Sequence, residues 1–222
     1  MTSHKTVRTF PIAGILFDSD GVLVDSHEAA AVAWNHWART WAPGFDFHRD
    51  AQHGRRLVDV VAELVGDGDT ALATRLLTEL ELELATEVPA VAGAVALLSS
   101  SPADRWAVVT SGGREMAAAR LRSAGLPTPR VLVSADDVSA GKPEPEPYLA
   151  GARLLGLDPR NCAVFEDARL GIMAARAAGA GLVVGVGAQT IGEDVDVSVA
   201  DLSGISFDGS DLVVDYDAIL TR

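Results

Sequence analysis

Two carboxylates stand two residues apart at the end of an apolar run near the N-terminus. The stretch GILFDSDGVLVDS covers residues 14–26, and its apolar half ends at Asp18, which is followed by Asp20 and a turn at Gly21. In an extended strand, residues i and i+2 point to the same side, so we expect Asp18 and Asp20 side by side and Ser19 pointing away. This spacing suits a nucleophile paired with a proton donor.

Three later apolar runs are also followed by polar side chains. Each group alone has an ordinary explanation as a turn or a helix cap. Four such groups at four successive strand ends indicate a single site, because ligands bind beyond the carboxyl ends of strands in an open α/β sheet. The later groups are Thr110, Ser111 and Gly112 after residues 106–109, Lys142 beyond residues 131–133, and Glu166 and Asp167 after residues 162–165.

Lys142 is unusual in so arginine-rich a chain. Of the 18 lysine and arginine residues, only Lys5 and Lys142 are lysines. A compact ammonium fits between a phosphate and carboxylates, whereas a planar guanidinium is a poorer match. This bias indicates that arginine does not fit at position 142.

Phosphoryl transfer is the chemistry that needs this set of groups. A carboxylate such as Asp18 can form an aspartyl-phosphate, and Asp20 can act as general acid and then as base. Clustered carboxylates repel a phosphate, so a hard cation is required, and Mg²⁺ suits Asp18 and Asp167. Thr110 and Lys142 are then expected to hold the remaining phosphate oxygens.

The elements that must position these groups indicate a doubly wound, Rossmann-like α/β core. The apolar runs are nearly continuous, as in strands of a parallel sheet covered on both faces, and helical patterns alternate with them. Three of the helical patterns stop at a glycine, as helix C-termini often do. The predicted strands are 12–17, 106–109, 131–133, 162–165 and 182–186, and the predicted helices are 91–98, 114–124, 147–155 and 170–178.

A helical insert interrupts this alternation directly after the first strand. The sequence predicts an α-helical cap domain at residues 25–91 and an α/β core domain at 1–24 and 92–222. The acidic tail adds short candidate strands at 197–200 and 212–214. The insert is predicted to contain helices at residues 28–41, 57–65 and 70–87.

Composition excludes several classes of protein. The net charge of −13 argues against binding to nucleic acid or anionic membranes. A single cysteine, Cys162, excludes an intrachain disulfide and a cysteine-rich zinc site, and the five histidines lack metal-ligand spacing. No window is long and apolar enough to span a bilayer, and the first residues lack a signal-peptide core. We therefore expect a cytoplasmic monomer.

Four motifs of the chain resemble those of the haloacid dehalogenase-like superfamily of phosphatases and mutases. The resemblance covers nearly the whole chain, and its first and fourth motifs are the most specific. The family's helical cap also falls where the insert lies. The motifs are FDSDGVLVDS, VVTSGG, GKPEPEPY and VFEDARLGIMAARAAG.

The resemblance implies a role for each polar residue at the strand ends. Asp18 is the nucleophile and Asp20 the general acid and base. Mg²⁺ is held by Asp18, the carbonyl of Asp20 and Asp167, with Glu166 beside them. The implied phosphate-binding residues are Thr110, Ser111 and Lys142.

The chain is most similar to the group of glycerol phosphatases and 2-deoxyglucose-6-phosphatases. HGRRLVDVV, RWAVVTSGGREMA, SADDVSAGKPEPEPYL and GISFDGSDLVVDYD carry this resemblance, while Gly113 replaces a threonine common in the group. It implies a Mg²⁺-dependent phosphatase that hydrolyses a small sugar or polyol phosphate monoester through an aspartyl-phosphate.

Other activities share some of these motifs. A β-phosphoglucomutase-like phosphosugar mutase remains the alternative, although Ala30 falls near the place where such mutases usually carry a histidine. A dehalogenase would lack Asp20, and a phosphonatase-like enzyme needs a lysine that residues 25–92 do not contain. A non-catalytic sugar-phosphate binding module would be expected to lose Asp18 or Asp20.

The segment QHGRRLVD in the insert carries the candidate substrate contacts. His53, Arg55 and Arg56 form either a solvated loop or a substrate-facing patch in an otherwise acidic protein. Arg56 falls where related capped enzymes place an arginine that contacts phosphate or sugar. We therefore expect Arg56 and His53 to face the substrate, and the choice between Arg55 and Arg56 stays open.

Overall fold

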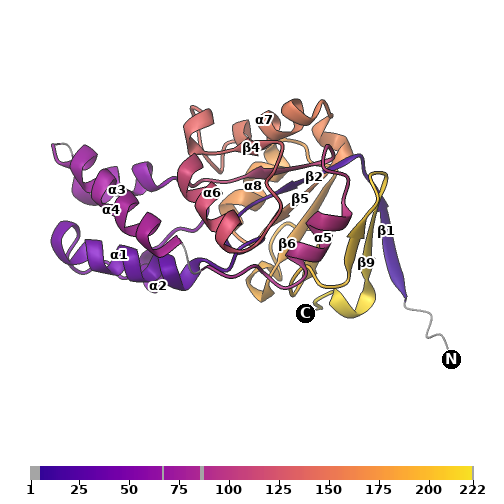
Figure 1. The fold of residues 1–222 in the computed structure, drawn as a ribbon, viewed down its shortest axis with the longest axis horizontal. Coiled ribbons are helices and arrows are strands. Elements are labelled where there is room, and N and C mark those ends of the chain that lie inside the picture. Colours follow the sequence, from indigo (N-terminus) through magenta and orange to yellow (C-terminus); the bar gives the residue numbers. More distant parts are fainter. Residues whose placement is uncertain (1–5, 67, 86–87, 222) are drawn as a thin grey trace.

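A six-stranded parallel sheet forms the centre of the protein in the computed structural model, which describes residues 6–66, 68–85 and 88–221 (Figure 1). The strand order is β4-β3-β2-β5-β6-β7. Phe17 on β2 is in register with Val108 on β3 and with Phe165 on β5, so the ends of these strands lie together. The strands are β2 (Gly14–Phe17), β3 (Trp106–Val109), β4 (Leu132–Val133), β5 (Cys162–Glu166), β6 (Leu182–Val186) and β7 (Val197–Val199).

Helices cover both faces of this sheet, which confirms the doubly wound α/β fold. Apolar residues of α5 and α6 share one core cluster with Phe17 and Phe165. The other face packs against α7 and α8, where Tyr148 and Ile172 lie in a second cluster. The continuous apolar character of the strands follows from this double burial. The helices are α5 (Ala94–Ser100), α6 (Arg114–Ser123), α7 (Glu146–Leu155) and α8 (Arg169–Ala177).

The helical insert forms a separate lobe at one end of the sheet (Figure 1). Its helices enclose an apolar cluster of their own, in which Trp34 and Trp37 are buried. The predicted helix 70–87 is observed as far as Leu84, and residues 86–87 lie outside the described part of the chain. The domain division at residues 25–91 stays our proposal. The insert contains α1 (His27–Trp41), α2 (Phe47–Asp50), α3 (Leu57–Val65) and α4 (Thr70–Leu84).

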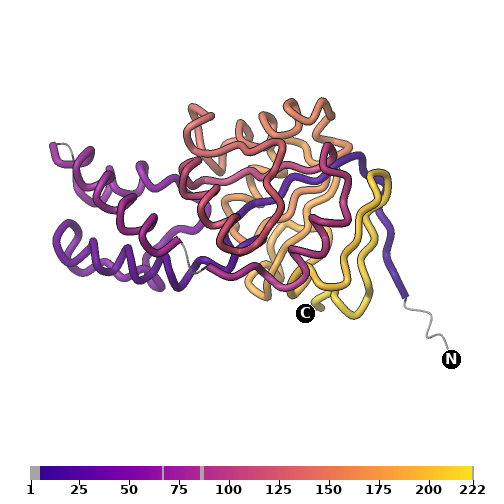
Figure 2. Tube along the Cα trace, viewed as in Figure 1, coloured from indigo at the N-terminus to yellow at the C-terminus, as the bar shows by residue number. Residues whose placement is uncertain are grey.

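A second, three-stranded antiparallel sheet brings the two ends of the chain together. Its order is β1-β9-β8, with β1 at Val7–Pro11, β8 at Ile205–Phe207 and β9 at Asp211–Asp215. In Figure 2 the indigo N-terminal strand runs beside the yellow C-terminal strands. The predicted strands 197–200 and 212–214 correspond to β7 and β9, whereas β1 and β8 were not predicted. Within the described ranges, no helix is both long enough and apolar enough to cross a membrane.

Candidate active site

Asp18 and Asp20 lie just beyond the end of β2 and line the same cavity. The backbone N–H of Asp18 still donates to the carbonyl of Phe165 on β5, which extends the sheet by one bond and fixes the start of the turn. Ser19 is fully buried, and its carbonyl accepts bonds from the turn that follows. The alternation of a strand therefore continues through these residues and directs both carboxylates to one side.

Lys142 lies between two carboxylates in the interior. Its Nζ donates to Oδ1 of Asp18 at 2.6 Å and to Oε1 of Glu166 at 2.6 Å. Nζ also lies 5.2 Å from the centre of the Tyr148 ring, and the Tyr148 hydroxyl donates to the same Glu166 oxygen. Burial alone would lower the pKa of Lys142, but the charges of Asp18 and Glu166 raise it above its usual range, so the ammonium stays charged.

Three buried acids lie close enough to share a cation. One carboxylate oxygen from each of Asp18, Glu166 and Asp167 lies within 4.8 Å of the others. Burial, followed by the charges of its neighbours, raises the pKa of Asp167 well above its ordinary value. Burial raises the pKa of Asp18 to about 7, although Lys142 opposes this. Acids that repel one another in this way attract a divalent cation, and an all-oxygen donor set suits Mg²⁺.

The two oxygens of Glu166 are engaged differently from those of its neighbours. Oε1 accepts from Lys142 and Tyr148, and Oε2 lies 3.3 Å from the backbone N–H of Ala168. Glu166 itself is completely buried on the last position of β5. It therefore holds Lys142 in place, whereas Asp18 and Asp167 line the cavity.

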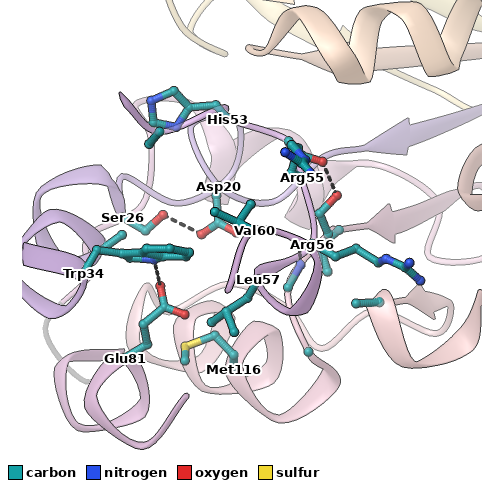
Figure 3. Close-up of a pocket in the computed structure, with 18 of the residues that line it drawn as sticks. Asp20, Ser26, Trp34, His53, Arg55, Arg56, Leu57, Val60, Glu81 and Met116 are labelled. Atoms are coloured by element: carbon teal, nitrogen blue, oxygen red, sulfur yellow. Dashed lines mark hydrogen bonds between the residues drawn. The ribbon is translucent and has the colours of Figure 1, made fainter. Parts of the chain in front are cut away.

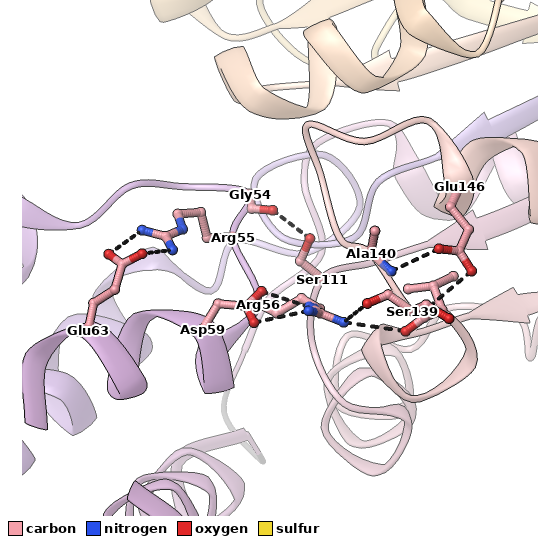
Figure 4. Close-up of polar contacts among 10 residues, drawn as sticks. Gly54, Arg55, Arg56, Asp59, Glu63, Ser111, Ser139, Ala140 and Glu146 are labelled. Carbon is pink, nitrogen blue, oxygen red and sulfur yellow. Dashed lines mark hydrogen bonds and ion pairs between the residues drawn. The ribbon is translucent and has the colours of Figure 1, made fainter. Parts of the chain in front are cut away.

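The polar residues after β3 approach the cavity from a second strand end. Thr110 is buried, and its Oγ1 accepts from the backbone N–H of Gly112 at 3.0 Å, which leaves the hydroxyl proton free to donate. Ser111 donates its hydroxyl to the carbonyl of Gly54 in the insert at 2.5 Å. Thr110 is thus directed into the core site, and Ser111 links the core to the insert (Figure 4).

Asp20 is bound by residues that the sequence analysis did not identify. Ser26 donates to Oδ1 of Asp20 at 2.5 Å, and Arg120 donates to the same oxygen through Nη1 at 2.8 Å. Arg120 also reaches Oε1 of Glu81 on α4 at 3.3 Å. Burial would raise the pKa of Asp20, but Arg120 and Ser26 lower it overall, so the carboxyl is ionised in this structure.

The positions of Arg120 and Glu81 on their helices contain the signal that could have identified these two residues. Arg120 lies four residues after Met116 on the buried face of α6. Glu81 lies four residues after Leu77 on the buried face of α4. A charged residue at an apolar position of a helix must find a partner, because an unpaired buried charge is very costly. Tyr148 was likewise missed, since the expected apolar face of α7 gave no reason to assign it a polar role.

Arg56, one of the two predicted substrate residues, lies where the insert contacts the core (Figure 4). Arg56 pairs with Asp59, and its Nη1 donates to the carbonyls of Val138 and Ser139 on the core. Arg55 instead pairs with Glu63 within the insert. Between the two arginines, Arg56 is therefore the one that spans the two parts of the molecule.

His53 also lines the cavity and keeps part of its surface exposed to solvent. Its ring centre is 4.8 Å from that of His27 and 5.5 Å from that of Phe47. Burial lowers the pKa of His53, which favours the neutral ring. Nε2 of His27 lies 3.6 Å from Oδ2 of Asp167. His27 therefore contacts both an acid of the core site and His53 of the insert.

A cavity of about 380 Å³ between the core and the insert joins these groups (Figure 3). Seven of the predicted site residues line it, while Lys142 and Glu166 lie buried beneath Asp18. Apolar side chains from the insert, including Trp34, Leu57 and Val60, form part of the wall. The cavity is large enough for a small phosphate ester with several carbons. The seven are Asp18, Asp20, His53, Arg56, Thr110, Ser111 and Asp167.

Comparison with known proteins agrees with the family predicted from the sequence. A family model described as haloacid dehalogenase-like hydrolase matches residues 12–179. Hexitol phosphatase A of Escherichia coli is 43% identical over 171 residues, which are 75% of this chain and 79% of that protein. Glycerol-1-phosphate phosphohydrolase 2 of Saccharomyces cerevisiae is 36% identical over 181 residues, 76% of this chain and 72% of that protein. The predicted resemblance to the glycerol-phosphatase group is thereby confirmed.

The fold is also found among solved structures. A β-phosphoglucomutase from Clostridium difficile superposes with a TM-score of 0.77 at 20% identity, and the match covers 88% of this chain and 94% of that one. At this identity the likeness concerns the fold alone. It extends beyond the α/β core, because a match of this length must include much of the helical insert.

Proposed function

The chain belongs to the haloacid dehalogenase-like hydrolase family, and from this membership we propose that it hydrolyses small sugar or polyol phosphates, with Mg²⁺ and through an aspartyl-phosphate at Asp18. The phosphatase activity is supported by the two curated relatives, which are a hexitol phosphatase and a glycerol-1-phosphate phosphohydrolase. The observation that carries the proposal is the position of Asp18, which is held by Lys142 and faces the same cavity as Asp20 and Asp167.

In the first step, Asp18 attacks the phosphorus atom of the ester. Oδ1 of Asp18 is bonded to Lys142, so Oδ2 is the oxygen left free to form the new bond. The bond between phosphorus and the ester oxygen breaks, and the leaving oxygen takes a proton from Asp20. A bound phosphate dianion raises the pKa of the nearby Asp20 carboxyl, which opposes the lowering by Arg120 and favours the protonated form.

In the second step, water hydrolyses the aspartyl-phosphate. Asp20 takes a proton from the attacking water, whose oxygen bonds to phosphorus as the bond to Asp18 breaks. Inorganic phosphate leaves and the Asp18 carboxylate is restored. Arg120 and Ser26 keep Asp20 oriented and ionised once the alcohol has left, which suits a general base.

Lys142 and Thr110 would hold the oxygens of the transferring group. An ammonium has three N–H donors, and Lys142 uses one on Asp18 and one on Glu166, which leaves a third for phosphate. The Thr110 hydroxyl keeps its proton available because it accepts from Gly112. Ser111 can join them only by releasing its bond to Gly54, so its contribution depends on the position of the insert.

The proposed Mg²⁺ ligands are carboxylate oxygens of Asp18 and Asp167 and the backbone carbonyl of Asp20, with Glu166 beside them. The cation supplies positive charge that offsets the charge of the phosphoryl group and of the acids. Burial first, and then the charges of the neighbouring acids, raises the pKa values of Asp18 and Asp167, so the ionised acids need a positive charge beside them. The residues present therefore fit a divalent cation.

The helical insert would provide the part of the site that contacts the alcohol. The core residues already described are engaged by phosphate and metal, so the carbon chain must extend into the cavity toward the insert. Closure over a small substrate would exclude water and fix its position. Arg56 and His53 both line this space and are the proposed substrate contacts.

A phosphate-release assay tests this function directly. The protein is incubated with a panel of polyol, sugar and nucleotide phosphates in the presence of Mg²⁺, and again with excess chelator. We expect phosphate release from polyol or sugar phosphates and none in the chelator. A mutase of the β-phosphoglucomutase type would instead interconvert phosphosugars with little net release. A preference for nucleotides would contradict the substrate class, and undiminished activity in chelator would contradict the metal.

A further inference from the structure

Two buried charges line the cavity next to Asp20. Glu81 comes from α4 of the insert, Arg120 comes from α6 of the core, and both line the cavity. Their side chains are only 10% and 6% exposed. Such a pair is costly to bury, and apolar residues of similar size would stabilise the fold at least as well. Its presence in a cavity wall therefore indicates a use beyond packing.

The pair retains unused hydrogen-bonding capacity. Trp34 and Arg120 both reach Oε1 of Glu81, each at a long distance of 3.3 Å. In the part of the chain that the structure describes, Oε2 of Glu81 has no hydrogen-bond donor. Nη1 and Nη2 of Arg120 each make one side-chain bond, although each carries two N–H groups, whereas Nε lacks an acceptor but is shielded from the cavity. Figure 3 shows Glu81 beneath Trp34 and beside Met116, at the wall of the pocket. An acceptor and a donor with free capacity at one wall fit a hydroxyl group, which both accepts and donates.

The position of Arg120 specifies which hydroxyl this is. The same guanidinium that reaches Glu81 donates to Asp20 at 2.8 Å. In the proposed function, Asp20 faces the ester oxygen that leaves. The first polar group of the alcohol beyond that oxygen is a hydroxyl on the neighbouring carbon, and it would enter the space between Asp20 and Glu81.

We propose that Glu81 and Arg120 bind the hydroxyl on the carbon next to the phosphorylated one, so that the enzyme selects phosphate esters of vicinal diols. Glu81 accepts a hydrogen bond from the hydroxyl through Oε2, and a terminal nitrogen of Arg120 donates one to the hydroxyl oxygen. This rests on the proposed function, because that function places the ester oxygen at Asp20. The same carboxylate would repel a second phosphate group, so it also selects against bisphosphorylated substrates.

The test compares two substrates of equal length. Glycerol 1-phosphate carries the neighbouring hydroxyl, and propane-1,3-diol monophosphate lacks it. A site that leaves a buried polar pair unsatisfied discriminates strongly against the analogue that lacks the hydroxyl. We expect the wild-type protein to prefer glycerol 1-phosphate by about 10- to 100-fold in kcat/KM. Equal kcat/KM values for the two esters would overturn the inference while leaving the phosphatase function intact.

Variants at Glu81 separate recognition from folding. Glu81→Met should lower the ratio of kcat/KM for glycerol 1-phosphate to that for the diol ester toward one, because any effect passed through Arg120 to Asp20 reduces turnover of both esters alike. Glu81→Gln keeps the shape but loses the charge, and it should give an intermediate ratio. Glu83→Met is the matched control, since Glu83 is exposed on the same helix. Equal losses on both esters in Glu81→Gln would overturn the inference.

Further outcomes of these assays distinguish a failure of the inference from a failure of the proposed function. Circular dichroism and the melting temperature show whether Glu81→Met folds. If it does not, the ratio of kcat/KM for the two esters in the wild-type protein and in Glu81→Gln still tests the inference. Hydrolysis of p-nitrophenyl phosphate with neither polyol ester turned over would overturn the inference alone. No hydrolysis of any of the three esters in the presence of Mg²⁺ would overturn the proposed function as well.

Discussion

The Nζ of Lys142 lies 2.6 Å from Oδ1 of Asp18, and this contact joins residues that are 124 positions apart in the chain. The ammonium is completely buried and is held from the other side by Glu166. It therefore counterbalances two carboxylates at once in a region with little solvent. A point charge of this size fixes the direction of Asp18 and still has one N–H free for phosphate.

Replacing Lys142 by arginine should be nearly as damaging as replacing it by alanine. The charge is preserved, but a planar fork cannot occupy a fully buried place between Asp18, Glu166 and the Tyr148 ring. We expect kcat to fall by about 10²–10³-fold in both variants, as for the loss of one stabilising donor. Steady-state kinetics with p-nitrophenyl phosphate measure this. Wild-type rates in Lys142→Arg would remove the argument from the scarcity of lysine.

Asp18→Asn should abolish turnover and change the pH dependence of stability in excess chelator. The folded-state pKa of Asp18 is about 7, above its ordinary value of 3.8, because the group is buried. Its contribution to stability is therefore fully present below pH 3.8 and is lost as the pH rises through about 7. The asparagine variant lacks this titration. Denaturant unfolding between pH 4 and 7.5 should show wild type losing stability relative to Asp18→Asn, and parallel curves would contradict the assignment.

Magnesium should stabilise the folded protein as well as activate it. A cation that binds only the folded state adds about 2.7 kcal/mol at a hundredfold excess over its Kd. For a chain of this length, that corresponds to a rise in melting temperature of about 5–10 °C. The rise should disappear in Asp167→Asn and persist in Asp104→Asn, a surface control. An equal rise in all three proteins would mean that the cation binds elsewhere.

Gly171→Ala should destabilise the protein, although alanine normally favours a helix. A Cβ at position 171 of α8 would overlap the carboxylate of Glu166, which cannot move without releasing Lys142. We expect a loss of about 1–3 kcal/mol in the free energy of unfolding and a lower kcat. Adding Glu166→Asp, which shortens the acid, should relieve the overlap but not restore activity, because it withdraws the carboxylate from Lys142. Unchanged stability in the single variant would show that Glu166 is free to move.

The sequence predicts the central part of the fold and site because both depend on local patterns. Apolar runs mark the strands, and the polar residue after each run lies at the shared edge of the sheet, so the meeting of Asp18, Lys142 and Glu166 follows from the topology. The second sheet was not predicted as a unit, because β1 pairs with β9 about 200 residues away. A strand as short and exposed as Val7–Pro11 gives little signal until its partner is known.

The contacts between the two parts of the molecule could not be predicted for a related reason. Arg120 and Glu81 belong to different elements and meet only when the insert packs against α6. Each is visible in the sequence as a charge on an apolar helix face, but the pattern does not say which partner satisfies it. Arg56 was predicted from resemblance, and its bonds to the carbonyls of Val138 and Ser139 were not foreseen.

Arg56→Ala should reduce kcat/KM for glycerol or hexose phosphates by about 10- to 100-fold, the expected cost of losing a charge-assisted hydrogen bond. Arg56 lines the cavity and bonds to the core, so its removal affects how the insert closes over a polyol. Turnover of p-nitrophenyl phosphate, which needs no hydroxyl contacts, should barely change. Arg55→Ala is the matched control, because Arg55 pairs with Glu63 inside the insert.

The pattern of losses in Arg56→Ala distinguishes two roles for this arginine. As a substrate contact, it affects only esters with hydroxyl groups, and the loss appears in polyol phosphates alone. As a purely structural link from Asp59 to the carbonyl of Ser139, it would affect every substrate to the same extent. Equal losses on glycerol 1-phosphate and p-nitrophenyl phosphate would therefore contradict substrate recognition by Arg56. In that case, the alcohol would have to be recognised by other residues of the cavity, such as His53 or Glu81.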